Sequence, residues 1–131
     1  HEMLGQLKAQ GYQMGIITNG KGQFQMDNII ALGIEQVMDT ILVSEWEGIS
    51  KPNPLIFERA CAKLGVAATE CVFIGDHPEN DVLAAMDVGM VGVWKVDTHW
   101  ERPNADYLVH DLLEITDLLR RLFNNQTNLL R

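Results

Sequence analysis

The stretch that decides the fold is Cys71-Val72-Phe73-Ile74-Gly75-Asp76-His77-Pro78-Glu79-Asn80-Asp81. Its first four residues predict a short buried strand, and Pro78 predicts the start of a helix, because proline is favoured in the first helical turn. Asp76 is therefore expected at the end of the strand and Asp81 in the first turn of the helix. In open α/β sheets, ligands bind beyond the carboxyl ends of the strands. Two carboxylates in that place suggest a hard divalent cation such as Mg²⁺.

Helices and strands are expected to alternate on both sides of this stretch. The expected helices cover 2–10, 23–32, 54–64, 82–88 and a last leucine-rich segment, and the expected strands cover 13–17, 37–43, 71–74, 90–94 and 107–109. Strands joined by helical crossovers pair in parallel, and helices then cover both faces of the sheet. The sequence therefore predicts an α/β fold of the Rossmann-like, doubly wound class.

Two of the expected helices carry apolar stripes at helical spacing. The stripe of the helix at 23–32 consists of Met26, Ile29, Ile30 and Leu32, and that of the last helix of Leu112, Leu113, Ile115, Leu118, Leu119 and Leu122. We expect these side chains to face the core. The segment from Asn124 onward is polar, so the expected division is a core domain at 1–123 and a tail at 124–131.

Composition limits the classes of protein that come into question. The 131 residues are 47% hydrophobic and 21% charged, which is ordinary for one globular domain. A net charge of −8 argues against general binding to nucleic acid or to an anionic membrane. No apolar run is long enough to span a bilayer, and no signal peptide is recognised. Cys61 and Cys71 read as reduced core residues. We therefore expect a cytoplasmic protein.

A second turn with chemistry is Thr18-Asn19-Gly20, which follows the expected strand at 13–17. Its hydroxyl, its amide and the backbone N–H groups are suited to donate to a phosphoryl oxygen. The alternative is an ordinary Asx or Ser/Thr turn that caps the following helix. The residues of this turn alone leave both interpretations open.

A third turn is Ser50-Lys51-Pro52, directly before the helix at 54–64. A lysine at that place is electrostatically unusual, because the amino-terminal end of a helix already favours anions. Lys51 is therefore a candidate to neutralise a bound phosphate or a crowded carboxylate. The alternative is a solvated lysine in a proline-bounded loop.

Two other residues of the acidic turn have ordinary explanations. Acids are favoured at helix starts, which accounts for Glu79, and His77 is expected as an N-cap or an exposed side chain.

Taken in order, Ile16-Ile17-Thr18-Asn19-Gly20, Lys51-Pro52 and Gly75-Asp76-His77-Pro78-Glu79-Asn80-Asp81 resemble motifs II, III and IV of the haloacid dehalogenase-like (HAD) hydrolase superfamily. Their order and spacing match, and the resemblance covers nearly the whole chain. The acidic turn resembles that of the phosphatase branch, because haloacid dehalogenases need no metal and usually carry a Ser/Asn-rich turn there. The resemblance implies a Mg²⁺-dependent hydrolase that acts on a small phosphorylated metabolite.

The resemblance also implies roles for particular residues. The phosphate of the substrate would be bound by Thr18, Asn19, Gly20 and Lys51. Mg²⁺ would be coordinated directly by Asp76, and Asp81 would hold the metal shell through water. Thr18, Lys51 and Asp76 would be the catalytic residues, with Lys51 stabilising negative charge on the nucleophile and the phosphoryl group.

One part of the family pattern does not occur in the chain. Family members carry an Asp-x-Asp pair whose first aspartate attacks phosphorus, and no Asp-x-Asp occurs in these 131 residues. The strand that bears it belongs between the strands at 13–17 and 71–74, in the middle of the sheet. Its absence removes about ten ladder hydrogen bonds, each worth roughly 0.5–1.5 kcal/mol, and leaves two apolar strand edges open.

We therefore expect an N-terminally truncated fragment of a larger hydrolase, in which the first, central strand and the cap are absent. The isolated chain should be inactive. A missing N-terminal segment or a second copy, in a strand-swapped homo-oligomer, is expected to fill the sheet. Two other functions remain in question. One is a hydrolytic haloacid dehalogenase, and the other is a non-catalytic α/β module that binds a partner through its open sheet edges.

Overall fold

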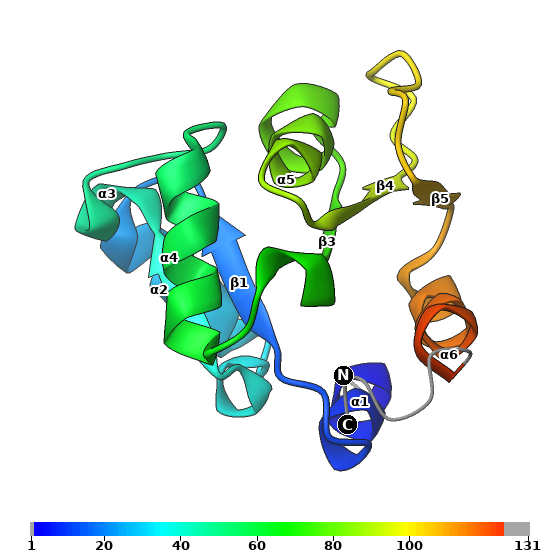
Figure 1. Cartoon of the computed structure of the whole chain (residues 1–131). Coiled ribbons are helices and arrows are strands. Elements are labelled where there is room, and N and C mark those ends of the chain that lie inside the picture. The colour runs from blue at the N-terminus through cyan, green and yellow to red at the C-terminus, as the bar shows by residue number, and fades with distance from the viewer. Residues whose placement is uncertain (1, 125–131) are drawn as a thin grey trace.

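The computed structural model describes residues 2–124, and within them the strands form two parallel sheets (Figure 1). In the first sheet, β1 (Gly15–Thr18) pairs with β2 (Thr40–Val43). In the second, β3 (Val72–Gly75) pairs with β4 (Val91–Lys95), which pairs with β5 (Tyr107–Val109). Every ladder is parallel, as the alternation of helices and strands predicts.

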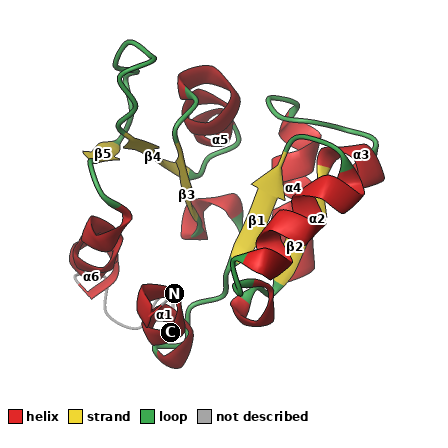
Figure 2. Ribbon diagram, turned by 180° about the vertical axis from the view of Figure 1, so that it is seen from behind, coloured by secondary structure: helices red, strands yellow, loops and turns green. Residues whose placement is uncertain are grey.

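The two sheets are adjacent at β1 and β3. Within the described residues, β1 pairs only with β2 and β3 pairs only with β4, so the edges that β1 and β3 turn toward each other form no ladder. Figures 1 and 2 show β1 and β3 as neighbours from both sides. A single continuous sheet would require a further strand between them. The expected fold class is confirmed: a Rossmann-like, doubly wound α/β layer that lacks its central strand.

The helices are α1 (Glu2–Ala9), α2 (Gly22–Ala31), α3 (Ser44–Glu47), α4 (Pro54–Leu64), α5 (Ala84–Asp87) and α6 (Ile115–Asn124). Shorter helical turns are η1 (Glu35–Val37), η2 (Ala68–Glu70), η3 (Pro78–Leu83) and η4 (Leu112–Glu114). No helix within 2–124 is long and apolar enough to cross a membrane. The tail expected at 124–131 lies, apart from Asn124, outside the described residues.

Helix α4 shows how the local sequence sets the bounds of an element. Asn53 caps its start, because the Oδ1 atom accepts a hydrogen bond of 3.0 Å from the backbone N–H of Leu55. Pro54 occupies the first helical position, where its missing N–H costs nothing. Gly65 ends the helix in the left-handed region, with φ at 69°. The expected helix, opened by the prolines at 52 and 54 and closed by Gly65, is confirmed, and its first residue is Pro54.

Helices cover both faces of the layer. One core lies on the side of α4 and α5 and is built from Ile17, Leu42, Ile56, Phe57, Ala60, Cys61, Ala84, Ala85 and Met90. The other lies on the side of α1 and α6 and is built from Leu7, Val93, Val109, Ile115, Leu118 and Leu119. Figure 2 shows α2 and α4 on opposite sides of β1 and β2.

Four expected core residues are exposed instead, namely Ile30, Leu32, Leu112 and Leu113. Ile29 is buried, and the next residue along an α-helix is rotated by about 100°, so Ile30 turns outward. Leu32 is the C-cap of α2. Leu112 and Leu113 lie in the 3-10 turn η4, whose three residues per turn place them off the apolar face of α6.

Three of the differences from the expected elements concern β2, α3 and η3. The expected strand at 37–43 begins only at Thr40, because residues 35–37 form the 3-10 turn η1. The short helix α3 has no expected counterpart. The expected helix at 82–88 is divided into the wide turn η3 and the α-helical turn α5. The wide turn belongs to the candidate site.

Candidate active site

The acidic turn runs from the end of β3 into η3. His77 caps η3, because its Nδ1 atom accepts a hydrogen bond of 3.0 Å from the backbone N–H of Asn80. The N–H of Val82 donates to the carbonyl oxygen of His77 at 3.3 Å, an i→i+5 bond that makes the turn wider than an α-helix. Wide turns of this kind occur frequently at functional sites. The N-cap interpretation of His77 is confirmed.

Asp81 lies inside this turn and is 5% exposed. Its Oδ2 atom accepts a hydrogen bond of 3.1 Å from the backbone N–H of His77. Its Oδ1 atom lies 2.5 Å from the Nζ atom of Lys51. The carboxylate also lies directly over Gly75, where an added Cβ atom would come within 2.4 Å of Oδ2. Gly75 is therefore required for the close approach of Asp81 to the end of β3.

Asp76 differs from Asp81 in its surroundings. Its side chain is exposed, and within residues 2–124 its carboxylate makes no hydrogen bond or ion pair. Its backbone carbonyl accepts a hydrogen bond of 2.9 Å from the indole Nε1 of Trp94, which fixes the turn from β4. The ring of the next residue, His77, packs against Trp100 with the ring centroids 4.5 Å apart. Asp76 is thus a free carboxylate on a well-held backbone.

Lys51 lies between the two sheets. Its backbone is bound by Asn19, whose Nδ2 donates to the Lys51 carbonyl oxygen at 3.0 Å and whose Oδ1 accepts from the Lys51 N–H at 3.0 Å. Its ammonium group reaches Asp81 and lies 5.7 Å from the ring centroid of Phe73. The side chain is 12% exposed, so Lys51 is not the solvated lysine of the alternative interpretation.

The turn Thr18-Asn19-Gly20 is held on its other side by residues that the sequence did not indicate. The backbone N–H of Gly20 donates to Ser44 Oγ at 2.8 Å. Gln25 Nε2 donates to the carbonyl oxygen of Asn19 at 2.7 Å. The Thr18 hydroxyl makes no hydrogen bond with the described residues and remains available to a ligand. The Gly20 amide, by contrast, already has a partner in this structure.

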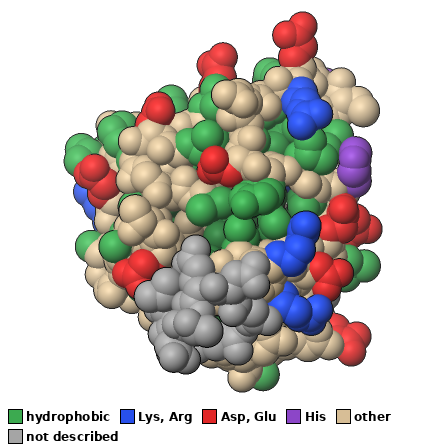
Figure 3. Space-filling view, turned by 45° about the vertical axis from the view of Figure 1, so that its right-hand side comes forward, with side chains coloured by type: hydrophobic (Ala, Val, Ile, Leu, Met, Phe, Trp, Pro, Cys, Tyr) green, Lys and Arg blue, Asp and Glu red, His purple; other side chains and the backbone are tan. Residues whose placement is uncertain are grey.

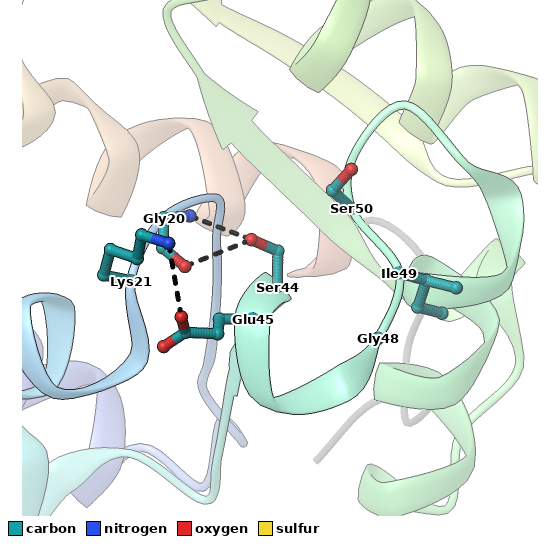
Figure 4. A pocket seen from close by; sticks show the side chains of 7 residues that line it. All are labelled: Gly20, Lys21, Ser44, Glu45, Gly48, Ile49 and Ser50. Atoms are coloured by element: carbon teal, nitrogen blue, oxygen red, sulfur yellow. Dashed lines mark hydrogen bonds and ion pairs between the residues drawn. The ribbon is translucent and has the colours of Figure 1, made fainter.

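A cavity of about 470 Å³ opens beside this turn and is lined by Gly20, Lys21, Ser44, Glu45, Gly48, Ile49 and Ser50. Figure 4 shows Ser44 directed at Gly20, and Lys21 directed at Glu45. The Nζ atom of Lys21 lies 3.6 Å from Glu45 Oε2. Hydroxyl groups and one charge pair thus line the cavity that adjoins the phosphate-type turn.

Glu45 has a second contact that explains the start of α2. The N-cap position of α2 is Lys21, whose side chain cannot accept a hydrogen bond. Glu45 Oε1 instead accepts a hydrogen bond of 2.7 Å from the backbone N–H of Gly22. Gly22 itself lies against Trp46, because an added Cβ atom would come within 2.1 Å of the indole. The sequence gives one sign of the Glu45–Gly22 hydrogen bond, because α2 starts without a residue of its own that can cap it.

The structure thus brings Lys51 into direct contact with both Asn19 and Asp81. Thr18 and Gly20 adjoin Asn19 along the chain, and Asp76 lies on the same turn as Asp81. No direct contact joins Thr18 to Asp76 within the described residues. These residues come from the carboxyl ends of β1 and β3 and from the start of α4. The three turns that the sequence singles out are thus connected through Lys51.

The donor set of the acidic turn fits a magnesium ion that keeps most of its water. Mg²⁺ commonly takes one or two carboxylates and completes its shell with water and phosphate. Asp76 offers a carboxylate without a partner, and each oxygen of Asp81 keeps a second lone pair for a water molecule. Within 2–124, no three His, Cys, Asp or Glu residues form a group that would hold a metal by themselves.

The fold and this edge of the sheet define an α/β protein with a candidate site for phosphate and a cation at its strand ends. Residues 1–94 match the family described as haloacid dehalogenase-like hydrolase. The chain belongs to this family. The match includes all three turns of the site, so the resemblance of the motifs is confirmed.

Individual relatives include phosphatases. The chain is 32% identical over 122 residues to the glyceraldehyde 3-phosphate phosphatase of Pyrococcus furiosus, covering 88% of this chain and 50% of the relative. A crystal structure of a HAD phosphatase from Thermococcus onnurineus superposes with a TM-score of 0.83 at 31% identity, over 90% of this chain and 55% of that one. These phosphatases bear out the resemblance to the phosphatase branch.

A solved structure of a 2-haloacid dehalogenase is similar as well. The enzyme from Pseudomonas syringae pv. Tomato DC3000 has a TM-score of 0.79 at 29% identity, over 93% of this chain and 52% of that one. The chain therefore spans about half the length of the relatives that it matches. Because both reactions occur on this fold, the choice between them depends on the site.

Proposed function

We propose that this chain supplies the phosphate- and metal-binding part of a Mg²⁺-dependent phosphatase that acts on a small phosphorylated metabolite. The observation that carries the proposal is the ion pair of Lys51 with Asp81, next to the free carboxylate of Asp76. Phosphate requires cationic and N–H donors, and Mg²⁺ requires oxygen ligands. The site offers both at one edge of the sheet, and the phosphatases among the relatives support the same function.

In this proposal, Asp76 would hold Mg²⁺ directly, and Asp81 would hold its shell through water. When bound, Mg²⁺ supplies positive charge that polarises the phosphoryl group. Asp81 is suited to hold this water shell because Lys51 and the N–H of His77 orient its two oxygens. The role of the protein is thus to present two carboxylates on one turn, with that of Asp76 free and that of Asp81 held in a fixed direction.

The phosphoryl group is bound from the other side of the site. The Thr18 hydroxyl is free to donate to one of its oxygens, and the Asn19–Gly20 segment lies beside it. An ammonium group carries three donors. Lys51 uses one of them on Asp81, so the others are available to stabilise negative charge on the phosphoryl oxygens. Preorganised donors of this kind lower the barrier of phosphoryl transfer.

The attacking group lies outside these residues in our proposal. In this family an aspartate of an Asp-x-Asp pair forms an aspartyl-phosphate, and the 131 residues contain no such pair. Without a nucleophile, positioning and charge stabilisation leave only a residual rate. The isolated chain is therefore inactive, and catalysis belongs to a longer parent protein.

The same parent protein supplies the strand between β1 and β3. Two parallel edges without a partner strand accept an extended segment by forming ladder hydrogen bonds on both of its sides. The chain spans about half the length of its relatives, which leaves ample chain for such a segment. Figure 3 shows hydrophobic side chains gathered near the middle of one face, where further protein would cover them. A strand-swapped homo-oligomer is the competing occupant.

We place the protein in the cytoplasm. Cys61 and Cys71 are free thiols whose Sγ atoms lie 3.9 Å apart, close enough that an oxidising compartment would favour their pairing. Fractionation of cells that express the tagged parent protein tests this placement. Recovery in the membrane or extracellular fraction contradicts it.

The deciding experiment compares the isolated chain with the intact parent protein on p-nitrophenyl phosphate. We expect turnover by the parent only, abolished by EDTA and restored by Mg²⁺. Asp76→Ala should lower kcat at least a hundredfold, whereas Asp87→Ala, which removes an exposed acid of α5, should leave it unchanged. Turnover by the isolated chain that Asp76→Ala abolishes would contradict its inactivity. Turnover by the parent that is unaffected by EDTA would contradict the role of Mg²⁺.

A second candidate function rests on the similarity to the haloacid dehalogenase. Such an enzyme hydrolyses a 2-haloacid through an aspartyl ester and needs no metal. Metal-independent halide release by the intact parent would favour it over the phosphatase. A non-catalytic module would instead form a discrete complex through β1 and β3, with no activity after the missing segment is supplied.

A further inference from the structure

We propose that Asn19 is a positioning residue for Lys51 and acts on the reaction through the lysine, not through a contact with the phosphoryl group. This inference rests on the proposed phosphatase function and refines the role of one residue of that site. It differs from the role that the family resemblance implies for Asn19. The argument starts from the hydrogen bonds that the Asn19 side chain makes.

The carboxamide of Asn19 forms a reciprocal pair with the backbone of Lys51. Its Nδ2 donates to the Lys51 carbonyl oxygen, and its Oδ1 accepts from the Lys51 N–H, both at 3.0 Å. The pair joins segments 32 residues apart and is partly buried. Two bonds to one residue fix the plane of the carboxamide as well as its position. The carboxamide carries the donor and the acceptor of these two bonds on separate atoms, with the geometry that a reciprocal pair requires.

Asn19 is itself held in place. Its carbonyl oxygen accepts a hydrogen bond of 2.7 Å from Gln25 Nε2, and it follows the last residue of β1 directly. The Lys51 backbone is thereby attached to the end of the first sheet. The ends of β1 and β3 are not joined by a ladder, so their relative position depends on contacts such as this one.

The lysine side chain completes the connection to the second sheet. Its Nζ atom lies 2.5 Å from Asp81 Oδ1, and Asp81 is bound in turn by the N–H of His77. The sequence of contacts therefore runs from Asn19 through the Lys51 backbone and ammonium group to the acidic turn. Loss of the Asn19 bonds frees the backbone of Lys51, and the ammonium group then samples positions away from Asp81.

The test is a double-mutant cycle in the intact parent protein, with p-nitrophenyl phosphate and saturating Mg²⁺. We expect Asn19→Ala to lower kcat at least tenfold. In the Lys51→Ala background, the same substitution should change kcat less than twofold, because the group that it positions is gone. If Asn19 contacts the phosphoryl group itself, the two effects multiply, and a tenfold loss in the Lys51→Ala background overturns the proposal.

A second measurement does not depend on phosphatase activity. The Lys51 amine is nearly buried and paired, so acetic anhydride should acetylate it slowly in the native protein. Mass spectrometry of peptides should show at least fivefold faster acetylation of Lys51 in Asn19→Ala, with exposed Lys63 unchanged as the internal reference. An unchanged Lys51 rate overturns the proposal. An accelerated Lys51 rate in a protein without phosphatase activity keeps this contact and rejects the proposed function instead.

Two further variants guard against general loss of structure. Asn53→Ala removes an asparagine of the same loop that caps α4 through Leu55 only, so we expect kcat and Lys51 acetylation to stay within twofold. Asn19→Asp keeps the acceptor for the Lys51 N–H and loses the donor, and should give an intermediate acetylation rate. Equal acceleration by Asn53→Ala and Asn19→Ala assigns the effect to loosening of the loop and overturns the proposal.

Discussion

The Nζ atom of Lys51 lies 2.5 Å from Oδ1 of Asp81, and the two side chains are 12% and 8% exposed. The lysine precedes α4, and the carboxylate belongs to the turn after β3. This ion pair is therefore a link between parts of the protein whose strands share no ladder. A nearly buried pair is costly to break on one side, because the remaining charge loses its partner but stays away from water.

The first prediction concerns the stability of this pair in the intact protein. Lys51→Met should lower the free energy of unfolding by about 3–5 kcal/mol, because it leaves Asp81 buried without its cation. The double variant Lys51→Met/Asp81→Leu should be more stable than Lys51→Met, since it removes both charges. Urea unfolding followed by tryptophan fluorescence measures both values. If the double variant is less stable than Lys51→Met and than Asp81→Leu alone, the explanation by burial of an unpaired charge is contradicted.

The second prediction concerns Gly75. A Cβ atom at this position would lie within 2.4–2.5 Å of three atoms of the Asp81 side chain. Gly75→Ala should therefore displace Asp81, lower the free energy of unfolding by about 1–3 kcal/mol and weaken Mg²⁺ binding, which calorimetry measures. Gly5→Ala is the matched control, because nothing lies within 4 Å of its Cβ position. In helix α1 this control should stabilise the protein by about 0.5–1 kcal/mol.

The elements that the sequence predicts correctly are set by local chemistry. Helix α4 is an example, because Pro54 and Gly65 mark its ends independently of the rest of the fold. The wide turn η3 could not be predicted in the same way. Its width depends on the His77 carbonyl oxygen, which accepts from the N–H of Asp81 at 3.1 Å as well as from that of Val82. The approach of Asp81 to Gly75 holds this arrangement, and periodicity does not report such contacts.

The candidate site divides in a similar way. The turns that carry Thr18, Lys51 and Asp76 could be found because each holds its chemistry within a few consecutive residues. Ser44 and Glu45 were missed, since their contacts with Gly20 and Gly22 join positions 24 and 23 residues apart. A partial signal was present, because α2 starts without a residue able to cap it. Such a start implies a cap from elsewhere but does not say from which residue.

The third prediction tests this external cap. Glu45→Ala removes the acceptor of the Gly22 N–H and should lower the free energy of unfolding by about 1 kcal/mol, as loss of an ordinary N-cap does. Glu45→Gln keeps an acceptor oxygen and should recover part of the loss. Glu58→Ala, at an exposed position of α4, is the control and should change stability by less than about 0.5 kcal/mol. Equal losses in Glu45→Ala and Glu58→Ala would contradict the capping role.

The fourth prediction concerns the acid dependence of stability. The hydrogen bond from Lys8 Nζ and that from the Met14 N–H hold the pKa of Asp39 below its ordinary value of 3.8. Because the pKa is lowered in the folded state, ionised Asp39 stabilises the fold. This contribution to stability is complete above the ordinary value of 3.8 and is lost as the pH falls through the pKa of the folded state. Because the pair with Lys8 is partly exposed, the contribution should stay under about 1 kcal/mol.

Asp39→Asn should therefore be less stable than the wild type at pH 6, and the difference should shrink as the pH falls to 3. Lys8→Gln should reduce the same acid dependence, since it removes the largest cause of the lowered pKa. Urea unfolding at a series of pH values measures both effects. A difference between Asp39→Asn and wild type that grows toward pH 3 would show that the sign is wrong.

The last prediction concerns the thiols at the far end of β3 from the site. Burial raises the pKa of Cys71 to about 12, and the neighbouring Cys61 thiol is the next largest cause of the increase. Its thiol also donates to the carbonyl oxygen of Ala67 at 3.5 Å. Only the thiolate reacts with alkylating agents, so at pH 8 a fraction on the order of one in ten thousand is reactive. We expect iodoacetamide to leave Cys71 unmodified in the native protein over hours and to modify it within minutes in guanidinium chloride.

A variant separates the two causes of the raised pKa. Cys61→Ser removes the neighbouring thiol but not the burial, so alkylation of Cys71 should become several-fold faster and remain slower than in the unfolded chain. Mass spectrometry of the Cys71 peptide follows the reaction. Fast alkylation of Cys71 in the native wild type would contradict the raised pKa. The same rate in Cys61→Ser and wild type would instead assign the whole shift to burial, because removal of the neighbouring thiol would then have no effect.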